Sequence, residues 1–179
     1  MGGVDKPMVE VGGVPMLVHV LAAVADARVC VVVGPQRTLP APQRRTPVRW
    51  VREDPPLGGP VAALAAAVPM LESDLVVLAA ADMPWFAGAV QPLLAAAQDT
   101  SADVVLLSAD GRLNYLAAVW RRAGLTAQLT GLGSAANVSM RALYRHVRNC
   151  PVPDPHGWGR DYDSWEELRA VQPEREDGG

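Results

Sequence analysis

The sequence is poor in cysteine, with only two among its 179 residues. Two thiols cannot build the disulfide framework that holds small secreted domains together. Cys30 lies in an apolar run typical of a strand, and Cys150 comes just before a short one. We therefore interpret both as reduced, inert thiols in or near the core, and we expect the protein to be cytoplasmic.

Concentrated positive charge is missing as well. The formal net charge is −3, and the longest basic cluster, Arg44-Arg45, stands in a proline-broken stretch typical of a solvated loop. This argues against a general nucleic-acid-binding protein. No apolar run reaches the ~20 residues needed to cross a bilayer, and no secretory signal precedes the first apolar segment. The sequence therefore predicts no nucleic-acid partner and no membrane contact.

Apolar residues make up 50% of the chain, which is enough for the core of one domain. Strand-length apolar runs alternate with helix-length segments, and this pattern predicts an α/β fold: a doubly wound, mostly parallel, Rossmann-like sheet in a three-layer α/β/α arrangement. We expect one domain over residues 1–171 and a disordered tail over 172–179. The expected strands are 29–33, 48–51, 75–80, 103–107, 116–120 and 151–153, and the expected helices are 15–25, 60–71, 88–98, 121–130, 135–147 and 164–171.

The first chemical cluster is the loop Gly2-Gly3-Val4-Asp5-Lys6-Pro7, followed by the expected helix 15–25. Gly2 and Gly3 allow the backbone to approach a ligand closely, and Lys6 places a cation behind them. Such loops normally connect a buried strand to a helix, whose N-terminal dipole then faces the phosphates. A glycine pair more often marks a simple turn, so the loop alone is a weak indication of phosphate binding.

The second cluster joins an expected strand to a helix and runs from Glu53 to Leu64 (EDPPLGGPVAAL). Its glycine pair lets backbone N–H groups face a planar or anionic ligand, and Asp54 could accept hydrogen bonds from a base or ribose. Pro60 after Gly58-Gly59 suits the first position of a helix. The alternative is an ordinary turn and helix cap carrying a solvated pair of acids.

Two further clusters supply carboxylates. Asp82 directly follows a fully apolar strand, where it needs a partner, and a hard cation such as Mg²⁺ is the common partner beside phosphates. As an N-cap for the helix near Gly88 it would come six residues too early. Asp161 and Asp163 would point to the same side of an extended segment and could reach one metal ion. Alternatively, both lie at the start of the last helix, whose dipole favours acids.

Together the four clusters resemble the molybdenum-cofactor guanylyltransferases, the MobA-like group of nucleotidyltransferases, from Met1 to about Val171. The family signature has the form L-A-G-G-x-x-x-R-M-G-G-x-D-K, and Met1–Lys6 (MGGVDK) matches its last six positions. The other matching segments are Glu53–Leu64 for the guanine-side loop, Val76–Pro84 for the metal-aspartate strand, Asp110–Trp120 for the strand beside the acceptor pocket, and Arg160–Leu168 for the closing motif.

The resemblance implies transfer of GMP from GTP to the phosphate of molybdopterin, with release of pyrophosphate. Lys6 would hold the nucleotide phosphates together with Gly2 and Gly3, and would act in catalysis with Asp82. On the nucleoside side the resemblance places Asp54, the Gly59–Pro60 turn and Gly34. Mg²⁺ would be bound by Asp82, with Asp161 or Asp163 beside it. Molybdoenzyme apoproteins or cofactor-assembly proteins would be partners.

The chain departs from the family pattern at three places. The first strand and the L-A-G-G-x-x-x-R part of the loop are not in the sequence, so we expect the natural start to lie upstream and weak or no activity from a chain that begins at Met1. Gly34 stands where the family often has asparagine, with Gln36 as a substitute. Asn114-Tyr115 and Trp165 replace residues typical of the family. A cytidylyltransferase, a sugar-phosphate nucleotidyltransferase, or an inactive nucleotide-binding relative therefore stays open as an alternative.

Overall fold

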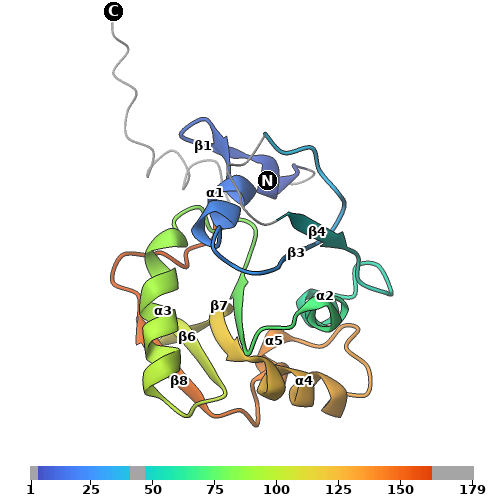
Figure 1. The fold of residues 1–179 in the computed structure, drawn as a ribbon, viewed down its shortest axis with the longest axis vertical. Helices are drawn as coiled ribbons and strands as arrows, with labels where there is room; N and C mark the ends of the chain where they lie inside the picture. Colours follow the sequence, from blue (N-terminus) through green and yellow to red (C-terminus); the bar gives the residue numbers. More distant parts are fainter. Residues whose placement is uncertain (1–3, 41–46, 163–179) are drawn as a thin grey trace, which may run out of the picture.

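The structure, a computed structural model, describes residues 4–40 and 47–162 (Figure 1). Six strands build the central sheet region, and a short hairpin lies near the amino end. The strands are β1 (Glu10–Val11), β2 (Val14–Pro15), β3 (Cys30–Val33), β4 (Val48–Val51), β5 (Leu75–Ala79), β6 (Val104–Ala109), β7 (Arg112–Arg121) and β8 (Asn149–Pro153). The helices are α1 (Met16–Ala23), α2 (Pro60–Ala67), α3 (Ala87–Asp99), α4 (Arg122–Gly131) and α5 (Met140–Leu143), with 3₁₀ turns η1 (Lys6–Met8) and η2 (Val68–Met70).

The strands of the central region form two separate pieces of sheet. β3 pairs with β4 in parallel, and the larger piece has the order β5-β7-β6-β8. Within that piece β7 runs antiparallel to both β5 and β6, while β6 and β8 are parallel. β6 and β7 are joined by the two-residue turn Asp110–Gly111, with φ of 51° and 74°. Positive φ at both positions is the geometry of a type I′ hairpin turn, which a glycine tolerates without strain.

Helices cover both faces of the larger sheet, as Figure 1 shows. Along β6, Val104 and Leu106 pack with α2, α4 and α5, whereas Val105 and Leu107 pack with α1 and α3. Because successive side chains of a strand point to opposite faces, a strand covered on both sides is apolar at every position. The expected three-layer α/β/α architecture is confirmed.

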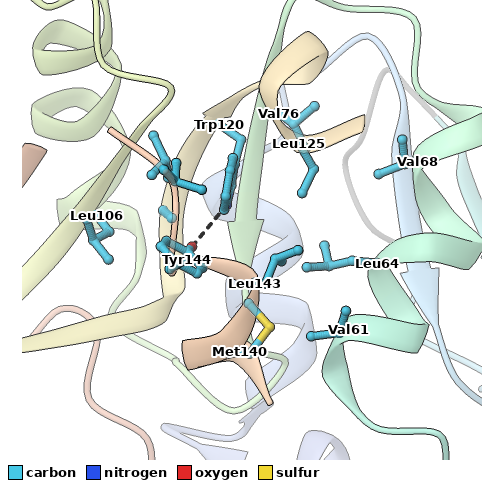
Figure 2. Packing of buried hydrophobic residues seen from close by; sticks show 13 residues of the cluster. Val61, Leu64, Val68, Val76, Leu106, Trp120, Leu125, Met140, Leu143 and Tyr144 are labelled. Atoms are coloured by element: carbon cyan, nitrogen blue, oxygen red, sulfur yellow. Dashed lines mark hydrogen bonds between the residues drawn. The ribbon is translucent and has the colours of Figure 1, made fainter. Parts of the chain in front are cut away.

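Figure 2 shows the core between the sheet and α2, α4 and α5. Its largest member is Trp120 of β7, which is completely buried. The Trp120 indole N–H donates a hydrogen bond to the Tyr144 hydroxyl at 3.0 Å, and that hydroxyl donates to the Tyr115 carbonyl at 2.9 Å. Buried tyrosine and tryptophan need such partners for their polar atoms. The pair therefore fixes the segment after α5 against β7.

Most expected elements occur near their expected bounds, and β4 has the expected ones. The expected helix 135–147 is wrong in extent, because only α5 is helical within it. Asn137 has a φ of 60°, which interrupts a helix, and Ser139 then caps α5 by accepting a hydrogen bond from the Ala142 N–H. The β1–β2 hairpin was not expected. The expected helix 164–171 and the tail 172–179 lie outside the described residues.

Candidate functional site

Asp5 and Lys6 lie beside the loop that follows β3. The Asp5 carboxylate accepts two hydrogen bonds from the Arg37 guanidinium, at 2.7 Å from Nε and 2.6 Å from Nη2. Hydrogen bonding by Arg37 lowers the pKa of Asp5, and the same contact raises the pKa of Arg37. This bidentate pair fixes the segment that carries Lys6, which continues into η1. Gly2 and Gly3 precede the described residues.

Gly34 lies where β3 and β4 end together. Its N–H donates to the Val51 carbonyl at 2.8 Å, and its φ of 143° suits glycine. A hollow of about 210 Å³ opens at this point, lined by Gly34, Gln36, Trp50, Val51 and Arg52. Its lining residues thus include an aromatic, an amide and a basic residue.

The loop from Glu53 to Gly59 is held by contacts of its own. Glu53 accepts a hydrogen bond from the Leu57 N–H at 3.1 Å, and the Gly58 carbonyl accepts one from the Asn137 N–H at 2.8 Å. A Cβ at Gly58 would lie only 2.8 Å from the Cβ of Ala62, so the loop packs tightly onto the first turn of α2. This arrangement holds the Asp54 backbone between β4 and α2.

Gly59 and Pro60 form the start of α2. Gly59 is the N-cap with a φ of 87°, and Pro60 is the first helical residue, as expected from the sequence. No side chain among the described residues caps this helix start by a hydrogen bond. A helix start of this kind favours an anionic or carbonyl-bearing ligand.

Asp82 is half-buried and follows β5 by three residues. It is not the cap of α3, because the N-cap of that helix is Phe86. Met83 and Phe86 are buried on either side of the turn, and the Phe86 N–H donates to the Met83 carbonyl at 3.1 Å. The backbone that carries Asp82 is therefore fixed by a buried turn at the carboxyl end of β5.

Asp161 is exposed in the segment after β8, and Asp154 organises that segment. The Asp154 carboxylate accepts hydrogen bonds from the N–H groups of Trp158 (2.8 Å) and Gly159 (2.9 Å). The Asn114 side chain of β7 donates to the Gly159 carbonyl at 2.6 Å. The segment thus has a defined conformation on the sheet, and Asp161 follows directly on it.

Trp85 and Tyr162 bring the segments of Asp82 and Asp161 together. The Trp85 indole N–H donates to the Tyr162 hydroxyl at 3.0 Å, across 77 positions of sequence. Tyr162 is buried in a small cluster with Val9, Val11 and Met16, against which Trp85 packs. The amino-terminal segment, the turn of Asp82 and the segment of Asp161 therefore meet at one edge of the sheet.

Two of the residues expected to bind Mg²⁺, Asp82 and Asp161, lie on segments that meet at this edge. The described residues contain no group of three or more His, Cys, Asp and Glu side chains placed to hold a metal ion. Mg²⁺ is typically held by one or two carboxylates together with substrate phosphates, so its binding by Asp82 and Asp161 stays a prediction. Asp163, the third expected ligand, lies outside the described residues.

No helix in the described part of the chain is long and apolar enough to span a membrane.

Sequence reasoning missed four residues that shape this edge. Three of them, Arg37, Trp85 and Tyr162, contact residues that are distant in the sequence. No local sequence pattern predicts such contacts. Asp154 had a local signal, because an aspartate shortly before a glycine-rich turn commonly accepts hydrogen bonds from the turn's N–H groups.

Known proteins resemble this chain in sequence. Residues 1–150 match the profile of the MobA-like NTP transferase domain. A protein of Synechococcus elongatus, named probable molybdenum cofactor guanylyltransferase, is 34% identical over 98 residues, which cover 52% of this chain and 48% of that protein. The chain thus spans about half the length of the curated relatives it matches.

Solved structures resemble it in fold. Molybdopterin-guanine dinucleotide biosynthesis protein A from Archaeoglobus fulgidus superposes with a TM-score of 0.67 at 14% identity, covering 95% of this chain and 90% of that one. 2-C-methyl-D-erythritol 4-phosphate cytidylyltransferase from Thermus thermophilus gives a TM-score of 0.70 at 18% identity, covering 93% and 92%. These likenesses confirm the expected Rossmann-like nucleotidyltransferase fold. With a profile match over most of its length, the chain belongs to the MobA-like NTP transferase family.

Proposed function

We propose that this protein transfers GMP from GTP to the phosphate of a molybdopterin-type molybdenum cofactor and releases pyrophosphate. Membership of the MobA-like family and the name of the Synechococcus relative support the proposal. The observation that carries it is the meeting of three segments at one edge of the sheet, joined by the Trp85–Tyr162 hydrogen bond and its apolar cluster. Those segments carry Lys6, Asp82 and Asp161.

In this proposal an oxygen of the acceptor phosphate attacks the α-phosphorus of GTP, and the bond to the β-phosphate oxygen breaks. Such transfer depends on positioning and on neutralising charge rather than on a protein nucleophile. Lys6 would hold the triphosphate, and the Arg37–Asp5 pair would keep its segment in place. Gly2 and Gly3 would supply backbone N–H groups to the same phosphates.

The nucleoside would lie over the carboxyl ends of β3 and β4. Gly34 leaves the hollow beside Trp50 open, and Asp54 would accept hydrogen bonds from base or ribose. The Gly59–Pro60 turn would present the uncapped start of α2 to the ligand. A guanine ring, with both donors and acceptors on its edge, suits a site that offers a carboxylate and backbone N–H groups.

Mg²⁺ would be held by Asp82, with Asp161 or Asp163 as a second carboxylate, and would neutralise the charge on the phosphates. The half-buried position of Asp82 supports this role, because a carboxylate there is poorly solvated. We place the reaction in the cytoplasm, which the two free thiols favour. Cofactor-assembly proteins or molybdoenzyme apoproteins would receive the product.

The first test measures nucleotide binding at Lys6, which is the single lysine of the chain. Because no other side chain carries an amine, the acetylation of lysine, measured by mass spectrometry, reports on Lys6 alone. GTP with Mg²⁺ is expected to slow acetylation of Lys6, and CTP to slow it much less. Equal protection by CTP would favour a cytidylyltransferase instead.

Transfer itself is measured as pyrophosphate release from GTP in the presence of molybdopterin. Asp82→Asn is expected to lower kcat/KM by about 100-fold or more, because it removes the charge that binds the metal. Asp99→Asn, at the far end of α3, is the matched control and should leave the rate unchanged. GTP binding without any transfer would support the inactive relative, and a normal rate for Asp82→Asn would disprove the assigned metal site.

A further inference from the structure

The pairing of β6 with β7 is interrupted close to the candidate site. Leu106 faces Ala118 and Ser108 faces Leu113, so a step of two residues along β6 corresponds to a step of five along β7. On the other side of β7 the last pair with β5 is Ala117 with Ala79. Residues 114–116 therefore take part in neither ladder and lie just beyond the carboxyl end of β5. Irregularities of this kind redirect side chains and are frequent beside active sites.

Two side chains satisfy the backbone groups that this interruption frees. The Asn114 side-chain oxygen accepts from the Leu116 N–H at 3.0 Å, and the Tyr144 hydroxyl donates to the Tyr115 carbonyl at 2.9 Å. The Asn114 carboxamide is thereby held by its oxygen, and its NH₂ group donates to the Gly159 carbonyl at 2.6 Å. The irregular part of β7 thus points one fixed donor at the segment that follows β8.

Gly159 is the point at which this segment touches the sheet. It is buried, and a Cβ at this position would lie 2.8 Å from Leu107 Cδ1 and 3.0 Å from Asn114 Nδ2. Its N–H donates to the Asp154 carboxylate at 2.9 Å, while its carbonyl accepts from Asn114. Both backbone polar groups of Gly159 are therefore bound, and its backbone lies closer to the sheet than any other residue type would allow.

A second anchor follows three residues later. The Tyr162 hydroxyl accepts from the Trp85 indole at 3.0 Å, and Trp85 stands three residues after Asp82. Only Arg160 and Asp161 lie between the anchor at Gly159 and the anchor at Tyr162. With both ends of so short a stretch fixed, the place of Asp161 relative to the turn of Asp82 depends on the two anchors.

We propose that Asn114 is a positioning residue of the transfer reaction. It holds the Gly159 carbonyl and thereby keeps Asp161 at the edge where Asp82 lies, without touching the substrate itself. The inference rests on the proposed function and extends it to a residue on β7 that acts only through the segment 159–162.

The experiment compares two variants of Asn114 with one control. Asn114→Asp keeps an oxygen for the Leu116 N–H but replaces the donor to Gly159 by a second oxygen, which repels the carbonyl. Asn114→Ala removes both bonds without adding charge, so an effect shared by the two variants is not caused by the new carboxylate. Asn149→Asp is the matched control, because the Asn149 amide on β8 also donates to a backbone carbonyl, that of Val147, at 3.4 Å.

Hydrogen exchange shows whether Asn114 fixes the segment, and it needs no substrate. The N–H groups of Trp158, Gly159 and Arg160 all have hydrogen-bond partners, namely Asp154 for the first two and the Gly157 carbonyl for the third. Both Asn114 variants are expected to speed exchange of these amides by about tenfold or more, and to leave the β6 amides unchanged. The Asn149 control should exchange like the wild type.

Kinetics then separates positioning from a purely structural role. Both Asn114 variants should lower kcat for pyrophosphate release by about tenfold, with the KM for GTP within about twofold, because the expected nucleotide contacts lie on other segments. In an Asp161→Asn background the same substitutions should change kcat by less than about twofold, since the side chain that they displace no longer contributes.

Three results would overturn the inference: unchanged exchange at residues 158–160, faster exchange that includes β6 to the same extent, or an equal loss of kcat with and without Asp161. The failure of the proposed function looks different, because wild-type protein would then release no pyrophosphate from GTP before any variant is compared. An active wild type that is indifferent to Asn114 would refute this inference alone.

Discussion

The buried hydrogen bonds of Tyr144 lead to a quantitative prediction about stability. Replacing Tyr144 by phenylalanine keeps the ring but removes the hydroxyl. This hydroxyl accepts from the Trp120 indole (Figure 2) and donates to the Tyr115 carbonyl. Trp120 is completely buried, so its N–H cannot turn to water instead. A buried donor left without a partner costs about 1–3 kcal/mol, and the second bond adds about 1 kcal/mol. We expect Tyr144→Phe to lower the free energy of unfolding by about 2–4 kcal/mol.

Urea denaturation followed by tryptophan fluorescence measures this loss. With an m-value of about 2 kcal/mol/M, the midpoint should fall by about 1–2 M urea. Tyr115→Phe is the matched control: its ring packs at a tilt against that of Tyr144 with centroids 4.8 Å apart, and no hydrogen bond of its hydroxyl occurs among the described residues. The control should shift the unfolding free energy by less than about 0.5 kcal/mol. If both variants unfolded at the same urea concentration, the reasoning from buried polar groups would be refuted.

The same residue sets an alkaline limit to stability. Burial raises the pKa of the Tyr144 hydroxyl far above its ordinary value. In the unfolded chain this hydroxyl ionises near pH ~10, whereas the folded protein retains the proton. The stabilising contribution is therefore complete below that pH and is lost as the pH rises further, by about 1.4 kcal/mol per pH unit. Tyr144→Phe should remove this part of the slope in urea titrations between pH 9 and 11, and an unchanged slope would contradict the assignment.

Two further predictions concern Gly88 in the first turn of α3 and the Arg37–Asp5 pair. A methyl group at Gly88 would overlap the Trp158 indole, so Gly88→Ala should destabilise the fold by about 1–3 kcal/mol in urea denaturation. Gly131→Ala, with no atom near the added methyl, should be neutral or stabilising by up to about 1 kcal/mol, and equal losses in the two variants would contradict the packing argument. Because Arg37 lowers the pKa of Asp5, the stability that this pair provides is present above pH ~3.9 and lost as the pH falls through the lowered value. Arg37→Gln should abolish this acid dependence, measured by denaturation between pH 5 and 2, and its persistence would show that other carboxylates cause it.

The strands and helices were largely predictable because their signals are local. Short runs rich in valine and other apolar residues mark β3, β4 and β5, and Pro60 after a glycine pair marks the start of α2. The extent of α5 was not predictable in this way, since nothing in the sequence requires Asn137 to adopt a positive φ. Its backbone there is set by packing with the Gly58 loop, to which its N–H donates.

The same difference between local sequence signals and tertiary contacts applies to the residues of the candidate site. Asp82 and Asp161 could be named as candidates from the sequence because each stands next to an apolar strand or a glycine-rich turn. Arg37 was not found, because it lies in an irregular loop 32 positions from Asp5. A side chain that acts through a distant partner has no sequence signal until the fold brings the two together.

The strand order has a consequence for how the protein is made. β5 pairs with β7 and not with β6, although β6 follows it first in the chain. Synthesis must therefore continue from Ala79 to Arg121, 42 residues, before the whole of β5 has its partner. At ~5–20 residues per second this takes about 2–8 s, during which an apolar strand waits with both edges open. The nascent chain is thus expected to depend on a holding chaperone over this interval, and a slower ribosome would lengthen that dependence.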